Sequence, residues 1–159
     1  MRIGIAGIGG RMGMLLAEEV AKAGATLAGG TRRGDDPRAL FAASEVVIDF
    51  THASTAAAHA ALAAETGVPL VLGSSGLDAA AEAAVADAAR RVPIVYAANF
   101  ATGVNLVLAI AERLAAALPG DAYDAEIVEM HHRQKVDAPS GTAIALGRAV
   151  AAGRGTALE

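Results

Sequence analysis

The chain has 159 residues, of which 54% are hydrophobic, 19% are charged and only 3% are aromatic. This composition excludes a disordered chain and allows one ordinary domain, or one domain with part of a second, packed mainly by small side chains. The formal net charge of −4 comes without a basic stripe for nucleic acid, and the absence of cysteine excludes disulfides, thiol chemistry and thiolate metal sites.

Strands and helices alternate along residues 1–100. Apolar runs predict five strands, over 2–6, 26–30, 46–50, 68–72 and 93–97. Helical spacing predicts helices over 12–23, 53–65 and 77–91. About a dozen residues, 33–45, separate the second and third runs, which leaves room for a loop with one or two turns of helix. Alternating strands and helices pair in parallel through right-handed crossovers, so we expect an α/β fold with a doubly wound, Rossmann-like sheet.

The character of the chain changes after Asn99. An apolar helix is predicted over 102–118, an alternating strand over 122–130 and another helix over 140–152. One strand cannot make a sheet, so residues 101–159 are interpreted as the start of an incomplete α+β unit.

Two apolar segments do not fit a membrane span or an export signal. The run 104–111 stops at Glu112 and Arg113, which makes it too short to span a bilayer. The glycine-rich N-terminus is broken by Arg11, unlike a signal peptide. We therefore expect a cytoplasmic protein that binds neither membrane nor nucleic acid.

The stretch GIAGIGGRMG joins the first predicted strand to the first helix. Its glycines are spaced as Gly7, Gly10 and Gly13, because a strict GxGxxG pattern would put its third glycine at Met12. Such a turn lets the backbone approach a pyrophosphate, whose charge then lies at the helix N-terminus. Directly after the first strand of a βαβ pattern, this spacing favours a dinucleotide site over a tight turn without a ligand.

The end of the second strand indicates which dinucleotide binds. NAD-preferring sites usually carry Asp or Glu there, whereas this chain has Arg32 and Arg33. Two guanidinium groups suit a 2′-phosphate, which accepts forked hydrogen bonds. We expect NADPH, with NADH tolerated because Asp35 and Asp36 could still bind a ribose. A solvated arginine pair without a ligand is the alternative.

Two more loops follow predicted strands, GSSG at 73–76 and AANF at 97–100. Ligands of open α/β sheets bind beyond the carboxyl ends of the strands. Both loops are therefore candidates for the nicotinamide end of the cofactor, although each signal is weak alone.

The densest group of ionisable residues is EMHHRQKVDAPSGTA, residues 129–143. His131 and His132 would point to opposite faces of an extended strand, so they are expected to have different tasks. Lys135 follows in a loop that can fold back. A metal site is disfavoured because no third ligand has a sensible spacing.

The same segment ends at a predicted helix start. Ser140 suits the N-cap position, and the N–H groups of Gly141 and Thr142 then make a site for a carboxylate. Together with a histidine that can titrate near neutrality, this arrangement suits an anionic substrate that must be protonated. A solvated charged loop and a phosphate site remain open alternatives.

These motifs together resemble the family of dihydrodipicolinate reductase, now called 4-hydroxy-tetrahydrodipicolinate reductase, of bacterial lysine and diaminopimelate biosynthesis. The motifs that match are GIAGIGGRMG, VVIDFT, VLGSSG, AANFATGVN and, most specific of all, EMHHRQKVDAPSGTA. The resemblance covers essentially the whole chain. It implies a Rossmann-like cofactor domain over 1–100, a substrate domain that starts within 101–159, and hydride transfer from NAD(P)H to a cyclic unsaturated dicarboxylate.

The resemblance also implies roles for individual residues. His131 matches the family's proton donor, Lys135 its second catalytic residue and His132 a substrate contact. The backbone of Gly141 and Thr142 matches a site for a substrate carboxylate. The expected cofactor contacts are Gly7, Ile8, Gly9, Gly10, Arg11, Met12, Arg32, Arg33, Gly73, Ser74, Ser75, Ala97, Ala98, Asn99 and Phe100. No metal is expected.

The chain departs from the family's pattern in three places. Arg32 stands where the family often has Glu, which favours NADPH, and the link 33–45 is short. The family's substrate domain continues for several more strands that assemble a homotetramer, whereas this sequence ends at Glu159. We therefore expect a reductase, although we do not expect this chain to form the family's homotetramer. The alternative is a cofactor-binding fragment that lacks activity. Another small-acid dehydrogenase is disfavoured by the motif at 129–143.

Overall fold

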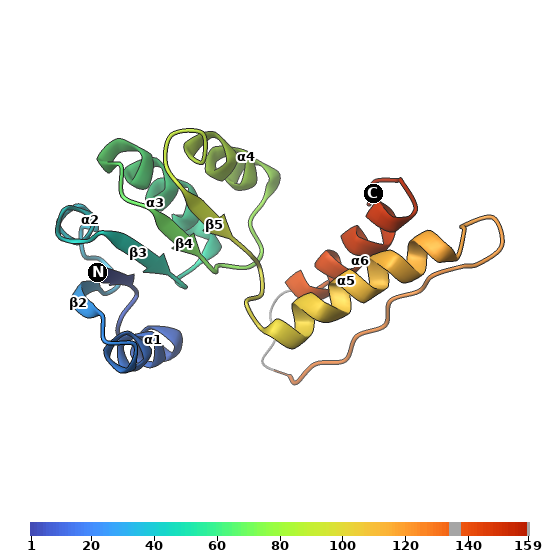
Figure 1. Ribbon diagram of the computed structural model, residues 1–159, viewed down its shortest axis with the longest axis horizontal. Coiled ribbons are helices and arrows are strands. Elements are labelled where there is room, and N and C mark those ends of the chain that lie inside the picture. Colours follow the sequence, from blue (N-terminus) through green and yellow to red (C-terminus); the bar gives the residue numbers. More distant parts are fainter. Residues whose placement is uncertain (134–137, 159) are drawn as a thin grey trace. The chain divides into compact units, whose positions relative to one another are not determined.

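The computed structural model describes residues 1–133 and 138–158 (Figure 1). The chain divides into two compact units, Met1–Ala97 and Ala98–Glu159.

The first unit is built on a five-stranded parallel sheet in the order β2-β1-β3-β4-β5. Its strands are β1 (Arg2–Ala6), β2 (Thr26–Thr31), β3 (Val46–Asp49), β4 (Leu70–Leu72) and β5 (Ile94–Tyr96). The chain proceeds from β1 to β2 in one direction and from β3 to β5 in the other. The topological switch point therefore lies between β1 and β3. The predicted α/β fold with a doubly wound sheet is confirmed.

Four helices connect these strands: α1 (Arg11–Lys22), α2 (Arg38–Ala43), α3 (Ala53–Thr66) and α4 (Ala79–Ala88). The six-residue α2 confirms that the link 33–45 holds only a short helix. Helix α3 begins after the N-cap residue His52 and ends at Gly67, whose φ of 70° is left-handed and suits glycine.

Alternate residues of the strands face two separate hydrophobic clusters, as the strand period of two requires. Ile3 and Ile5 pack with Val20 of α1 on one side of the sheet. Val47 packs on the other side with Phe41 of α2 and with residues of α3 and α4. The sheet is thus covered on both faces, as expected for parallel strands.

The described residues of the second unit contain two helices that pack against each other, α5 (Thr102–Ala117) and α6 (Gly141–Gly153) (Figure 1). Gly153 lies against the carbonyl oxygen of Glu112, so a Cβ at this position would overlap it. The residues that the two helices bury are small: Ala115, Gly147 and Ala151. Within the described part of the chain, no helix is both long and apolar enough to cross a membrane.

The strand predicted over 122–130 is wrong. This segment pairs with no strand, and all its residues except the half-buried Glu129 are exposed. Alternating side chains favour an extended chain, but a strand also needs a partner for its backbone N–H and C=O groups. The described residues of the second unit offer none, so the segment runs irregularly between the two helices.

Helix α1 approaches the loop after β1 so closely that only glycine fits at one position. A Cβ on Gly13 would overlap the carbonyl oxygen of Gly7 and lie 2.6 Å from the Cα of Ile8. Both neighbours are backbone atoms, which cannot move aside as a flexible side chain can. The third glycine of the motif therefore sets how closely helix and loop pack.

We predict that Gly13→Ala lowers the free energy of unfolding by about 1–3 kcal/mol, the usual cost of overpacking. Gly103→Ala is the matched control, since Gly103 also lies in a helix but a Cβ added to it would meet no neighbouring atom within 4 Å. Urea unfolding followed by circular dichroism measures both variants. Equal stability of the two variants would contradict the packing argument.

Candidate functional site

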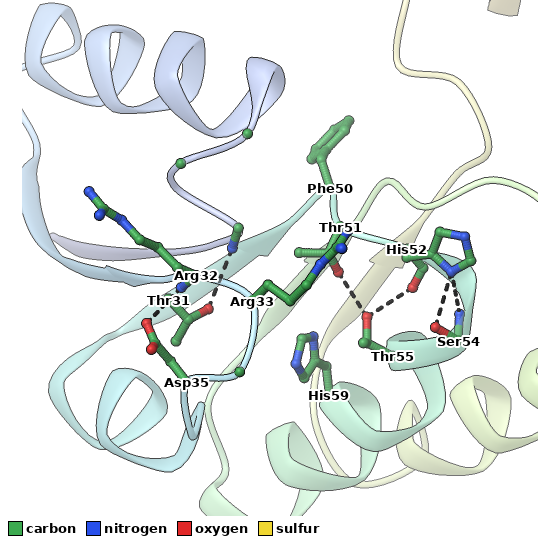
Figure 2. Close-up of a pocket in the computed structure, with 14 residues that line it drawn as sticks. Thr31, Arg32, Arg33, Asp35, Phe50, Thr51, His52, Ser54, Thr55 and His59 are labelled. Carbon is green, nitrogen blue, oxygen red and sulfur yellow. Dashed lines mark hydrogen bonds between the residues drawn. The ribbon is translucent and has the colours of Figure 1, made fainter. Parts of the chain in front are cut away.

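A cavity of about 870 Å³ opens at the carboxyl ends of β1, β2 and β3 (Figure 2). Three segments form its wall: the glycine loop after β1, the loop after β2, and the turn from β3 into α3. The cavity therefore lies at the switch point, where open α/β sheets bind their ligands.

The glycine loop forms one side of this cavity. Gly7 has a φ of 75°, a left-handed conformation that favours glycine, and its carbonyl accepts a hydrogen bond from the N–H of Gly10 (2.9 Å). Gly10 is the N-cap residue of α1, and having no side chain it leaves the first N–H groups of the helix without a side-chain cap. Those N–H groups and the positive end of the helix dipole suit a phosphate.

Two arginines stand at the end of β2. Arg32 and Arg33 both line the cavity, and the Arg32 side chain lies beside Gly9, 3.6 Å from where a Cβ would be. The backbone N–H of Arg32 donates to the carboxylate of Asp35 at 2.8 Å. Neither guanidinium forms a salt bridge with another described residue, so both remain available for an anionic ligand.

A buried hydroxyl near the sheet's carboxyl edge tests whether a cofactor fits. Ser74 follows β4 and is only 4% exposed, yet its Oγ has no hydrogen-bond partner among residues 1–133 and 138–158. Buried polar groups are usually paired, so an orphaned hydroxyl beyond a strand end indicates a missing polar partner. Two places on the cavity wall, the glycine loop and the arginine pair, thus fit a dinucleotide, and Ser74 lies outside that wall.

The structure brings together some of the predicted cofactor contacts and not others. The cavity wall includes Gly7, Gly9, Gly10, Arg32 and Arg33. The other predicted contacts of the first unit, which do not line the cavity, are Ile8, Arg11, Met12, Gly73, Ser74, Ser75 and Ala97. Ala98, Asn99 and Phe100 belong to the second unit. The roles of all these residues remain predictions.

The sequence interpretation missed the wall that follows β3. The cavity residues after β3 that were given no role are Phe50, Thr51, His52, Ser54, Thr55 and His59. Thr31 and Gly34, at the end of β2 and in the loop after it, were also given none, whereas Asp35 of that loop, which also lines the cavity, was considered for a ribose. The run VVIDF was recognised as a strand, and the switch-point rule could have assigned the residues after it to the site. Figure 2 shows Thr51, Thr55 and His59 on the side formed by the turn after β3 and by α3, with Arg32 and Thr31 on the other side.

The second unit holds a compact network around Glu129. One carboxylate oxygen accepts a hydrogen bond from the N–H of Ser140 at 2.8 Å. The other accepts from the Ser140 hydroxyl at 2.5 Å and from Nε2 of His131 at 2.8 Å. The Ser140 Oγ also accepts from the N–H of Ala143, which confirms Ser140 as the N-cap of α6.

This network joins two of the predicted functional elements, the histidine and the helix start. His131 and the first turn of α6, which contains Gly141 and Thr142, are held together by Glu129, a residue to which the sequence interpretation gave no role. His132 is exposed, and Lys135 lies outside the described residues. Among the residues described, no three His, Cys, Asp or Glu side chains are grouped so as to hold a metal ion.

Hydrogen bonds lower the pKa of Glu129 to about 2. The hydroxyl of Ser140 has the largest effect, followed by His131 and then the backbone N–H of Ser140. Each of these donors stabilises the charged carboxylate. Glu129 is therefore ionised at neutral pH and acts only as an acceptor toward its three donors.

Comparison with known proteins agrees with this geometry. Residues 1–100 match the family model described as "Dihydrodipicolinate reductase, N-terminus", and residues 103–158 match that described as "Dihydrodipicolinate reductase, C-terminus". The chain belongs to the dihydrodipicolinate reductase family. The resemblance stated from the sequence motifs is thereby confirmed.

Individual relatives are similar along nearly the whole chain. The 4-hydroxy-tetrahydrodipicolinate reductase of Acidiphilium cryptum (strain JF-5) is 64% identical over 158 residues, which are 99% of this chain and 64% of that protein. The enzyme of the same name from Granulibacter bethesdensis is 59% identical and is covered to 66%. The chain thus spans about two thirds of the length of these curated relatives.

A solved structure has the same fold. The dipicolinate-bound dihydrodipicolinate reductase from Paenisporosarcina sp. TG-14 superposes with a TM-score of 0.71 at 25% sequence identity. The match covers 97% of this chain and 66% of that one.

We predict that the Glu129 network makes the stability of the second unit depend on acidic pH. The pKa of Glu129 is lower in the folded than in the unfolded chain, so its stabilising contribution is complete above about pH 4.5 and is lost as pH falls toward about 2. Glu129→Gln should be less stable than the parent at pH 7 and should lose less stability over this acidic range. Urea unfolding at a series of pH values measures the effect.

Glu126→Gln is the control for this prediction, because Glu126 is an exposed acid of the same segment. It should reproduce the pH dependence of the parent chain. If Glu129→Gln and Glu126→Gln behaved alike, the hydrogen bonds to Ser140 and His131 would not contribute to folding.

Proposed function

We propose that this chain carries the cofactor and catalytic sites of an NAD(P)H-dependent reductase that converts 4-hydroxy-tetrahydrodipicolinate to tetrahydrodipicolinate in lysine and diaminopimelate biosynthesis. The observation that carries the proposal is family membership along both units, with curated relatives that bear the name of this reductase. The cavity at the switch point and the Glu129 network support it on physical grounds.

The cofactor of this proposal is NADPH, with NADH bound more weakly. Its pyrophosphate binds along the glycine loop at the N-terminus of α1, where the first N–H groups of the helix have no side-chain cap. The 2′-phosphate binds Arg32 and Arg33, which form no salt bridge with other described residues.

The second unit binds and protonates the substrate in this proposal. When bound, the nicotinamide supplies a hydride to the ring of a cyclic unsaturated dicarboxylate. His131 donates the accompanying proton, and Lys135 is the second catalytic residue. Because Nε2 of His131 is hydrogen-bonded to Glu129, Nδ1 is the ring nitrogen left to face the substrate.

The substrate's carboxylates bind where the helix α6 begins. Ser140 and Glu129 fix this helix start, and the N–H groups of Gly141 and Thr142 in its first turn have no acceptor within the helix itself. Such N–H groups favour an anion. His132 is a further substrate contact, and holding the ring in position accounts for much of the rate enhancement.

The decisive experiment is NADPH oxidation, followed by absorbance, by the purified chain with freshly prepared substrate, alongside a fluorescence titration with NADPH. Turnover would establish that residues 1–159 form a working site. Cofactor binding without turnover would favour the alternative, a cofactor-binding fragment that lacks activity. Absence of NADPH binding would overturn the proposed cofactor site.

We predict that His131→Ala lowers kcat by at least ~100-fold, the usual size of a general-acid contribution. The Kd for NADPH should not change, because the dinucleotide cavity is built from the first unit. Steady-state kinetics and a cofactor titration measure the two quantities. Losses of equal size in turnover and in cofactor affinity would contradict the role of His131.

We predict that Arg33→Ala weakens NADPH binding by about 10–100-fold, the value of a charge-assisted hydrogen bond, and weakens NADH binding far less. Arg38→Ala is the control, since Arg38 pairs with Glu65 at 3.1 Å and does not line the cavity. Titrations of each variant with both cofactors measure the ratio. An unchanged ratio in Arg33→Ala would remove the argument for a 2′-phosphate site.

A further inference from the structure

A buried carboxylate lies directly behind the cavity wall that the sequence interpretation missed. Asp49, the last residue of β3, is 0% exposed. It accepts hydrogen bonds from the N–H of Thr51 at 2.8 Å, from the Thr51 hydroxyl at 2.5 Å and from Nδ1 of His59 at 2.6 Å. Three donors are what a carboxylate needs to remain in a dry environment.

This arrangement fixes the orientation of the His59 ring. A carboxylate can only accept, so Nδ1 of His59 is the donor and Nε2 lies on the far side of the ring from Asp49. The ring of Phe41 packs against the imidazole at a centroid distance of 6.3 Å. The His59 side chain is 11% exposed and forms part of the cavity wall, as Figure 2 shows.

Asp49 also reaches the glycine loop, through Thr51 on the same wall as His59. The methyl group of Thr51 lies 2.6 Å from where a Cβ on Gly7 would be, so this side chain supports the glycine loop. The Thr51 hydroxyl continues the network to the hydroxyl of Thr55 at 2.8 Å. One carboxylate therefore holds both the loop that receives the pyrophosphate and a histidine on the facing wall.

The position of His59 indicates which part of a dinucleotide it would meet. The pyrophosphate belongs at the glycine loop, and the ribose phosphate belongs at Arg32 and Arg33. His59 lines the same cavity as these two groups, on the side formed by α3. The adenosine half of the cofactor carries both the pyrophosphate and the 2′-phosphate. It is therefore the part of the dinucleotide that His59 would meet in this cavity.

We propose that His59, oriented by Asp49, is a binding residue for the adenosine half of the dinucleotide, and that Asp49 is its positioning residue. This inference rests on the proposed cofactor. The competing role is purely structural, in which the Asp49–His59 pair joins β3 to α3 and the ligand does not touch the imidazole.

His59→Asn separates the two roles. The amide nitrogen of asparagine can replace Nδ1 as the donor to Asp49, whereas nothing replaces the Nε2 edge of the ring. We expect this variant to bind NADPH about five- to tenfold more weakly, the value of one lost hydrogen bond, with a Tm close to that of the parent. NADH affinity should fall by the same factor, because the contact does not involve the 2′-phosphate.

Asp49→Asn is the second variant, and it alters the network without changing any group on the cavity wall. The amide oxygen of asparagine can still accept from both Thr51 donors, but its NH2 group would meet the Nδ1–H of His59, so the imidazole loses its fixed orientation. NADPH affinity should fall at least as far as in His59→Asn. Fluorescence titration measures Kd, and thermal melts of each variant without ligand report folding.

Each outcome bears on one claim. Failure of the parent chain to bind NADPH would overturn the proposed function, and this inference with it. A parent that binds NADPH while folded His59→Asn binds it equally well would overturn only the inference and favour the structural role. A loss in His59→Asn that affects NADPH but not NADH would also overturn it, since the contact would then belong to the 2′-phosphate.

Discussion

The pairing of β1 with β3 places Ala6 opposite Asp49, and the cavity depends on this register. Each strand ends at that pair, so the glycine loop and the turn that contains Thr51 leave the sheet side by side. Because Asp49 is buried, its carboxylate must be satisfied by nearby donors, and those donors are Thr51 and His59. The need to satisfy one buried charge thus orders two walls of the site.

The second unit also contains a carboxylate whose hydrogen bonds come from a backbone N–H, a hydroxyl and an imidazole. Glu129 accepts from the N–H and hydroxyl of Ser140 and from a ring nitrogen of His131. In both units, therefore, a carboxylate binds the backbone and hydroxyl of one residue and a single imidazole. The difference lies in burial, since Asp49 is inaccessible whereas the Glu129 side chain is 27% exposed. Asp49 organises a wall inside the fold, and Glu129 holds an accessible histidine beside a helix start.

Local signals predicted most elements of the fold. Apolar runs located the five strands, and Ser140 was recognised as an N-cap because a hydroxyl at that position meets the free N–H groups of a helix. The strand predicted for 122–130 was wrong because a strand also depends on a partner. The alternation of side chains was a correct local signal, but the described part of the unit supplies no partner strand. For the site, the glycine loop and the arginine pair were found, whereas His59 and Glu129 were not.

By itself, the sequence determined the order of strands in the first unit, the glycine turn and the family, since each depends on residue type and spacing along the chain. Only the tertiary structure decided which side chains meet. Asp49 of β3 and His59 of α3 are ten residues apart, and Glu129 of the irregular segment is eleven residues from Ser140 at the start of α6. No periodicity links either pair. Their contacts arise because strand register and helix packing bring distant backbone together, and because a carboxylate withdrawn from water must find its donors there.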